Sequence, residues 1–280
     1  MADRIVCKIL LDLIVLACVG LPCLFLVLWG EPYERGFFEA DSSIRLPYRE
    51  ETIPESILGS VGFALIVVTV LIVEFVRDRR GKNAGEKFLA GTLIPGWLWE
   101  TYTTVGIFSF GAALQQLTTD STKYVVGRLR PHFYDVCRPI YNASNPLNTL
   151  NYIQDFSCSA ATGFELKNIR LSFPSAHSSF AVYTAVFFCC YLQVKCRWRG
   201  SKLLRHGVQF AVFLGAWYVG LTRVVENYHH WSDVGFGYLV GAFYGFLIFI
   251  YVLKPKKYGP PIAWDEPAPQ NVLPRPVLAR

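Results

Sequence analysis

The residues best suited to chemistry form three short polar clusters that lie far apart in the chain. They are KYVVGRLRP (123–131), PSAH (174–177) and TRVVENYHHWSD (222–233). Their basic side chains, Lys123, Arg130 and Arg223, are better partners for a phosphate dianion than for a metal cation. Their histidines could supply a nucleophile and a proton donor. Positive charge on the phosphoryl oxygens, an in-line nucleophile and a proton for the leaving oxygen are the main needs of phosphoryl transfer.

The third cluster places two histidines close to one carboxylate. On a helix, His229 and Asp233 would share a face, so that the carboxylate could accept the Nδ1 proton and leave Nε2 free to attack. His230 is three residues from Asp233, so spacing alone leaves open which histidine acts. Either one could also be an ordinary histidine at a membrane interface.

The second cluster precedes an apolar run. Pro174 and Ser175 are residues that open helices, and the free N–H groups of a helix N-terminus favour phosphate. His177 would lie in the first turn. A capping serine and an interfacial histidine would explain this cluster almost as well.

The first cluster closes an apolar run. Lys123 and Arg130 are seven residues apart, which returns to nearly the same helix face, and Pro131 predicts that the helix ends there. Basic residues at helix ends also reach lipid headgroups without any catalytic role. An anion site is favoured because this end is predicted to lie outside the cytosol, where no bias toward basic residues operates.

The elements that must position these clusters are predicted to be membrane helices. Of the 280 residues, 52% are hydrophobic and only 17% are charged, against about 25% charged in soluble domains. The apolar residues form blocks of about 20, the length that crosses a bilayer. The blocks are 6–28, 55–76, 98–121, 171–193, 208–224 and 233–253. The sequence thus predicts an all-α integral membrane domain over 1–257, with six transmembrane helices, and an unpacked proline-rich tail over 258–280.

Basic residues set the predicted orientation. They gather near the N-terminus and in 77–87, 195–206 and 254–257, all on one side if the count is six. That side is therefore expected to be cytosolic, with both termini inside. The net charge of +6 then reflects topology and attraction to anionic lipids, and nucleic acid is not an expected partner. All three polar clusters arrive together at the opposite, extracellular or lumenal face.

The segment between the first two clusters has features of an extracytoplasmic loop. Asn142 begins the acceptor sequon NAS. Cys137 and Cys158 are expected to form a disulfide, because the other six cysteines lie in or near the predicted spans. Two free thiols are the alternative.

The three clusters resemble the motifs K-x6-RP, PSGH and SR-x5-H-x3-D of the lipid phosphate phosphatases, members of the type 2 phosphatidic acid phosphatase superfamily. The resemblance covers most of the chain. It implies that His229, not His230, is the nucleophile and forms a phosphohistidine, with Asp233 orienting it. His177 would protonate the lipid alkoxide and then activate water. The implied phosphate ligands are Lys123, Arg130, Ser175, Ala176 and Arg223.

The resemblance also implies the substrates: phosphatidic acid, lysophosphatidic acid, sphingosine 1-phosphate and ceramide 1-phosphate. No metal or other cofactor is expected. Membrane lipids and the bilayer are the expected partners, a homo-oligomer is left open, and the plasma membrane or an endomembrane is the expected location.

Two residues depart from the family pattern. Thr222 replaces a serine and keeps the hydroxyl. Ala176 replaces the glycine of PSGH, and its Cβ would be unfavourable at a positive φ or against a closely approaching phosphate. The leading alternative is therefore a catalytically impaired relative that binds lipid phosphates. A lipid transporter and a zinc hydrolase using His177, His229 and Asp233 are minor alternatives.

Overall fold

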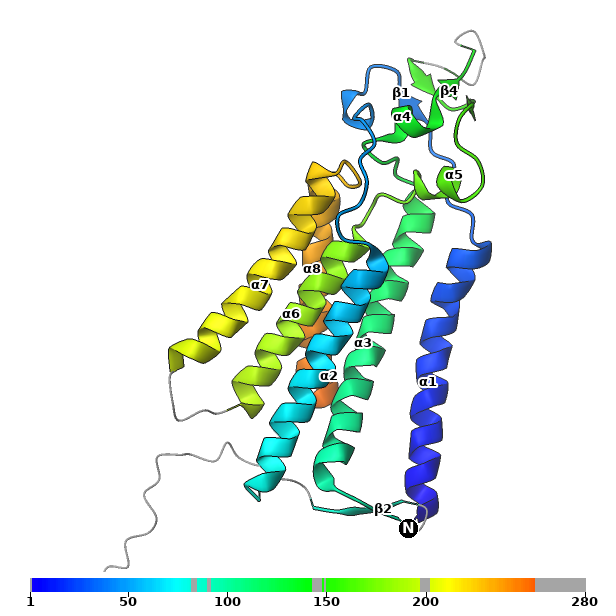
Figure 1. Ribbon diagram of the computed structural model, residues 1–280. Coiled ribbons are helices and arrows are strands. Elements are labelled where there is room, and N and C mark those ends of the chain that lie inside the picture. The colour runs from blue at the N-terminus through cyan, green and yellow to red at the C-terminus, as the bar shows by residue number, and fades with distance from the viewer. Residues whose placement is uncertain are drawn as a thin grey trace, which may run out of the picture.

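Long helices dominate the computed structural model, which describes residues 2–81, 85–89, 92–142, 148, 150–196 and 202–254. They lie side by side as a bundle, with the connecting loops gathered into a small cap at one end (Figure 1). The long helices are α1 (Ala2–Trp29), α2 (Glu55–Arg79), α3 (Gly96–Val126), α6 (Ala176–Lys195), α7 (Lys202–Val225) and α8 (Trp231–Leu247). A π-helical segment, η2 (Ile248–Leu253), continues α8. The predicted tail, 258–280, lies outside the described residues.

Five of the described helices are long and apolar enough to cross a membrane: Ile5–Trp29, Glu55–Arg79, Ala176–Lys195, Leu203–Val225 and Trp231–Leu253. The multi-pass helical class is therefore confirmed. α3 is 31 residues long and packs against α1, α2 and α6, but it is less apolar than the five helices above. Its polar side chains Glu100, Gln115 and Asp120 are buried inside the protein. A crossing by α3, and with it the count of six, remains a proposal.

The helix bounds differ from the predicted blocks at one informative place. The block 171–193 starts too early, because α6 begins only at Ala176, after the irregular segment 171–175. Hydropathy alone could not separate these residues from the helix. The apolar Leu171 and Phe173 extend the block, whereas Pro174 and the cap Ser175 fix where the helix starts.

α6 is the central helix of the bundle. Tyr183 and Phe187 on α6 are fully buried and pack against Phe108 of α3. Its closest neighbour is α8, whose small residues let the two backbones approach. A Cβ added at Gly241 would lie 2.2 Å from the carbonyl oxygen of Ser179 on α6.

Only some glycines of α8 take part in this contact. Gly237, Gly241 and Gly245 face α6, but a Cβ at Gly235 would meet nothing within 4 Å. Substitution by alanine is therefore expected to disturb the packing at the first three positions and not at Gly235.

The cap contains short elements that the prediction of an all-α fold did not include. The short helices are η1 (Ser42–Ile44), α4 (Phe133–Cys137) and α5 (Phe164–Asn168). β1 (Phe37–Phe38) pairs with β5 (Tyr152–Ile153), and β4 (Pro139–Ile140) pairs with β6 (Ser157–Cys158). β2 (Lys87–Leu89) and β3 (Thr92–Ile94) pair at the other end of the bundle. A disulfide joins Cys137 to Cys158 and ties α4 to β6.

A buried ionic network holds three helices together at the end of the bundle far from the cap. Lys195 of α6 lies 3.2 Å from Glu74 of α2 and 3.6 Å from Glu100 of α3. The hydroxyl of Tyr191 donates to Glu74 at 2.8 Å. These contacts explain how α3 carries a carboxylate inside an apolar bundle.

Candidate active site

The three polar clusters meet at the capped end of the bundle. There α3 and α7 end, and α6 and α8 begin (Figure 1). Backbone hydrogen bonds join the clusters directly. Ser172 N–H donates to the carbonyl of Arg128 at 3.0 Å, and Ser175 N–H donates to the carbonyl of Asp233 at 3.1 Å. The second cluster is thus fixed by its backbone against both the first cluster and the third.

His229 lies in the turn between α7 and α8 and is almost fully buried. Its Nδ1 is 2.6 Å from the carbonyl oxygen of Ser172. A carbonyl can only accept, so Nδ1 carries the hydrogen and Nε2 is the unprotonated nitrogen. Burial holds the pKa of His229 well below its ordinary value, and the charges of Arg130 and Lys123 lower it further. The ring is therefore neutral, the state that a nucleophile requires.

Asp233 does not make the contact predicted from spacing. Its Oδ2 is 3.9 Å from His229 Nδ1, too far for a hydrogen bond. The spacing argument fails because α8 begins at Trp231, so His229 is not on the helix that carries Asp233. The carboxylate instead closes a capping box, accepting from His230 N at 3.0 Å.

Asp233 is nevertheless fully buried and makes several contacts close to His229. The hydroxyl of Ser172 donates to its Oδ2 at 2.6 Å, and the guanidinium of Arg128 pairs with its Oδ1. Ser172 therefore touches both residues: its hydroxyl contacts Asp233 and its carbonyl contacts His229. The link between Asp233 and His229 is indirect.

The N-terminus of α6 presents the second cluster as predicted. Ser175 is the N-cap, and its side chain accepts from Ser178 N–H. The Nε2 of His177 is buried and has no hydrogen-bond partner among the residues that the structure describes, and the backbone of Ile53 contacts the ring. Such an unpaired buried atom marks a place for a ligand. Ala176 is the first residue of the helix and does not have a positive φ, so its Cβ causes no backbone strain.

The three predicted cations have different surroundings. Lys123 lies 3.5 Å from Asp120, one turn earlier on α3. Arg130 is buried and donates to the carbonyl and side-chain oxygens of Asn168, and burial lowers its pKa to about 10. Arg223 is completely buried. Arg130 and Arg223 both stack on the ring of Tyr228.

Carboxylates that the sequence analysis did not assign face Arg223. Glu226 pairs with one of its terminal nitrogens, and Glu51 Oε1 lies 3.7 Å from the other. Burial raises the pKa of Glu51. The sequence signal for Glu226 was its i,i+3 spacing from Arg223. Nothing in the sequence pointed to Glu51, which a loop brings back over the site.

That loop, 45–54, is a strap across the clusters. Arg49 donates to the carbonyl of Val225 at 3.1 Å, and Thr52 N–H donates to Glu226 at 3.0 Å. Together with the contact from Ile53 to His177, these bonds attach the start of α2 to the second and third clusters. The strap also encloses His177 and Arg223.

A largely apolar cavity of 410 Å³ opens beside His177. Residues of α1, α2, α3 and α6 line it, including Gly20, Gly59, Ala113, His177 and Phe180. It therefore extends from the polar cluster into the membrane-spanning part of the bundle. Such a shape suits an amphiphile with a polar group at His177 and an apolar chain among the helices.

The two remaining predicted site features lie in the cap. Asn142 is exposed, whereas the next two residues of its sequon lie outside the described residues. Cys137 and Cys158 are bridged, as stated above. Within the described ranges, no three His, Cys, Asp or Glu side chains are grouped so as to hold a metal ion.

The fold and the site define a class: a multi-pass membrane protein with cations and two histidines, His177 and His229, gathered at one end of its helices. Comparison with known proteins specifies this class further. The family model described as PAP2 superfamily matches residues 104–257, which include all three clusters. The chain belongs to this superfamily, and its similarity to the phospholipid phosphatases confirms the resemblance predicted from the motifs.

The relatives cover most of the chain. A Putative phosphatidate phosphatase of Drosophila melanogaster is 41% identical over 262 residues, which are 89% of this chain and 69% of the relative. Phospholipid phosphatase 2 of Bos taurus is 39% identical over 90% of this chain and 85% of its own length. Phospholipid phosphatase 1 of Rattus norvegicus is 37% identical over 87% and 84%, respectively. No solved structure matches the chain.

Proposed function

We propose that this phosphatase hydrolyses phosphate monoesters of membrane lipids through a phosphohistidine on His229. The observation that carries the proposal is the state of His229 itself. Its Nδ1 donates to the Ser172 carbonyl, so Nε2 has a free lone pair within a cluster of cations. A neutral imidazole held in one tautomer beside positive charge is suited to attack phosphorus.

In the first step, Nε2 of His229 attacks phosphorus and the bond to the lipid oxygen breaks. Lys123, Arg130 and Arg223 would carry the charge of the phosphoryl oxygens, with Ser175 and the N–H of Ala176 at the start of α6. A bound dianion favours the protonated ring of His177, whose Nε2 has no protein partner. That ring would give its proton to the leaving alkoxide.

In the second step, the now neutral His177 takes a proton from water, and the hydroxide attacks the phosphohistidine. The N–P bond breaks, and inorganic phosphate leaves. No metal takes part in this scheme. Glu51 is the looser of the two carboxylates near Arg223, so the phosphate would replace it there. Asp233 would support His229 through Ser172.

The apolar cavity beside His177 favours lipids as substrates. Phosphatidic acid, lysophosphatidic acid, sphingosine 1-phosphate and ceramide 1-phosphate all join a phosphate monoester to an apolar chain. With the phosphate among the cations, the chain could extend between α1, α2 and α6. A small soluble phosphate ester has no apolar chain to bury in this cavity, so it would gain less binding energy than a lipid.

We further propose that α3 is the sixth span, that both termini are cytosolic, and that the site faces the extracellular or lumenal side. The basic segments at the far end from the cap support this orientation. The exposed Asn142 and the Cys137–Cys158 bridge in the cap suit an oxidising, glycosylating compartment. Endoglycosidase should increase the gel mobility of the wild-type chain but not that of an Asn142→Gln variant. Glycosylation at another position would contradict the orientation.

Phosphate release tests the proposed activity. The purified chain in lipid–detergent micelles, with a chelator present, should release phosphate from all four lipids. His177→Ala should reduce release by about 10²–10⁴-fold, the usual contribution of a general acid. The matched control is His206→Ala, because His206 is exposed at the other end of the bundle, where its Nδ1 is 2.9 Å from the side-chain oxygen of Gln209. Equal activity of the two variants would overturn the proposal.

A further inference from the structure

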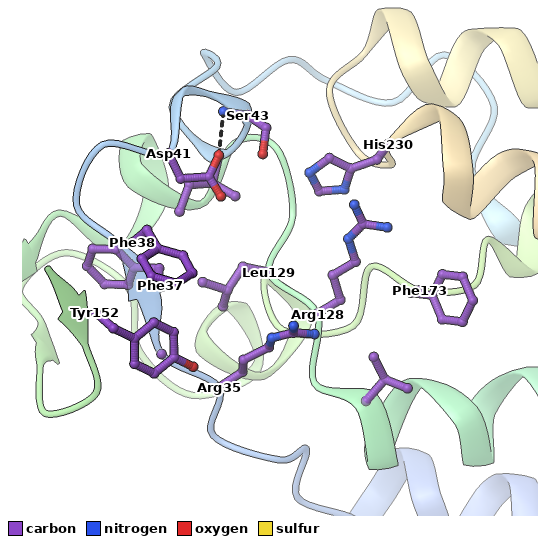
Figure 2. A pocket seen from close by; sticks show the side chains of 13 residues that line it. Arg35, Phe37, Phe38, Asp41, Ser43, Arg128, Leu129, Tyr152, Phe173 and His230 are labelled. Atoms are coloured by element: carbon purple, nitrogen blue, oxygen red, sulfur yellow. Dashed lines mark hydrogen bonds between the residues drawn. The ribbon is translucent and has the colours of Figure 1, made fainter. Parts of the chain in front are cut away.

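A second cavity of 450 Å³ lies in the cap and is lined in part by Arg128 and His230 (Figure 2). Both side chains also contact Asp233. The β1 strand and the loop after it form one wall. The segment after α3, Phe173 and His230 form the other wall. The proposed mechanism uses none of the side chains that line this cavity.

The charged groups of this cavity are mainly cationic. Arg35 and Arg128 extend into the same region, with the ring of His230 above them in the view (Figure 2). Among the described residues, the side chain of Arg35 has no hydrogen bond or ion pair. Asp41 is the acidic member of the lining, and its Oδ1 already accepts from Ser43 N–H at 2.9 Å.

Arg128 retains donors for a ligand. The contacts of Arg128 with Ser232 and Asp233 both use Nη1. The contact of His230 with Asp233 uses Nδ1. Two guanidinium groups in one cavity repel each other unless an anion lies between them, and planar guanidinium groups match phosphate oxygens well.

The rest of the lining suits an amphiphile or a small anion near the membrane boundary. Phe38, Tyr152 and Phe173 contribute rings to the walls. Phe173 packs on Phe236, which is half exposed on the outer surface of α8. The cavity thus lies level with the start of a membrane helix, where lipid headgroups would be.

We propose that this cavity is a second binding site for a phosphate group, either free or carried by a membrane lipid, with Arg35 and Arg128 as its ligands. The site is separate from the cation cluster at His229. Its lining includes none of Lys123, Arg130 and Arg223, and Arg35 belongs to neither the motifs nor the strap.

Occupancy of this site would alter catalysis through Arg128. A bound phosphate competes with Asp233 for the guanidinium of Arg128. Asp233 would then lose one of the contacts that hold it against Ser172, whose carbonyl positions His229. This consequence rests on the proposed function, but binding itself does not. The expected effect of occupancy at this site is a lower kcat, whereas competition by phosphate at the site of His229 raises only the apparent KM.

Arginine footprinting tests binding without requiring activity. The inactive His229→Gln chain would be treated with phenylglyoxal, with and without inorganic phosphate, and modification mapped by mass spectrometry. Phosphate should slow modification of Arg35 by about fivefold or more. Arg138 is the internal control, since it is exposed in the cap and outside the cavity. Equal protection of Arg35 and Arg138, or no protection of Arg35 by either inorganic phosphate or the anionic lipid of the second arm, would overturn the proposal.

A second arm identifies the source of the phosphate. Micelles containing an anionic phosphodiester lipid, phosphatidylglycerol, would replace inorganic phosphate, with phosphatidylcholine micelles as the reference. Protection by the lipid alone indicates a headgroup, and protection by inorganic phosphate alone indicates the free ion.

Kinetics test the coupling. Inorganic phosphate should lower kcat in the wild-type chain and in Arg138→Gln, but only raise apparent KM in Arg35→Gln. If inorganic phosphate lowered kcat in Arg35→Gln as much as in the wild-type chain, the coupling would be refuted. If the chain released no phosphate at all, the proposed function would fail. The phenylglyoxal footprint would still show whether phosphate binds at Arg35.

Discussion

Replacing Asp233 with asparagine separates two ways in which this carboxylate could support His229. The motif resemblance implies that Asp233 orients the nucleophile directly. In the structure, the Nδ1 of His229 instead donates to the Ser172 carbonyl at 2.6 Å, and Asp233 Oδ2 is 3.9 Å away. Asparagine keeps the size of the side chain but replaces one acceptor oxygen with a donor.

The structure sets the expected size of the effect. A catalytic histidine that depends on a direct aspartate contact loses about 10⁴-fold in kcat when that residue becomes asparagine, because the wrong tautomer forms. Here the Ser172 carbonyl still fixes the tautomer in Asp233→Asn. Loss of the contacts from Arg128 and the Ser172 hydroxyl should shift His229 only modestly. We expect a 10–100-fold decrease, or about 1.4–2.7 kcal/mol in the activation free energy.

Stability should fall as well, by about 2 kcal/mol. Removing one member of a fully buried ion pair costs about 3–5 kcal/mol. The Arg128 side chain is 32% exposed and can turn toward water, which reduces that penalty.

Single-turnover measurements and thermal unfolding in detergent would check both values. Ser172→Ala is the matched control, because it removes the hydroxyl that contacts Asp233 but leaves the carbonyl that contacts His229. It should lose less than about tenfold in rate. A loss near 10⁴-fold in Asp233→Asn, with normal stability, would refute the indirect role of Asp233.

Three further predictions follow from particular residues. Ala176→Gly should change kcat by less than about threefold, because Ala176 has no positive φ to relieve; a large gain would show that its Cβ obstructs phosphate. Gly241→Ala should lower the unfolding free energy by about 3 kcal/mol, since its Cβ would lie 2.2 Å from the Ser179 carbonyl, whereas Gly235→Ala should be neutral; equal melting temperatures would contradict this. Burial lowers the pKa of His132 to about 4. Its contribution to stability is therefore complete above pH 6.5 and decreases by about 1.4 kcal/mol per unit as pH falls toward 4. The melting temperature of His132→Gln should depend less on pH across this range, and parallel pH profiles would contradict the assignment.

The helical class and the convergence of the clusters could be predicted because both depend on strong sequence signals. Blocks of about 20 apolar residues have few structures available other than membrane helices. Once the blocks alternate in direction, Lys123, His177 and Arg223 must reach the same end. Charged residues in or beside such blocks also stand out from their apolar neighbours.

The contacts around the nucleophile could not be predicted, because irregular backbone makes them. The acceptor for His229 is a carbonyl of residue 172, and any residue type would supply that group. Asp233 turns toward its own helix start because the helix begins after His229 and not before it. Glu51 reaches Arg223 only through the path of the 45–54 strap. Periodicity carries no information about any of these positions.

Rapid-quench labelling with a ³²P-labelled lipid phosphate tests the central claim most directly. The account predicts an acid-labile phosphoenzyme that maps to His229, with the phosphate on Nε2 because Nδ1 is occupied by the Ser172 carbonyl. His229→Ala should form no phosphoenzyme and release no phosphate. Label on another residue, label on Nδ1, or turnover by His229→Ala would contradict it.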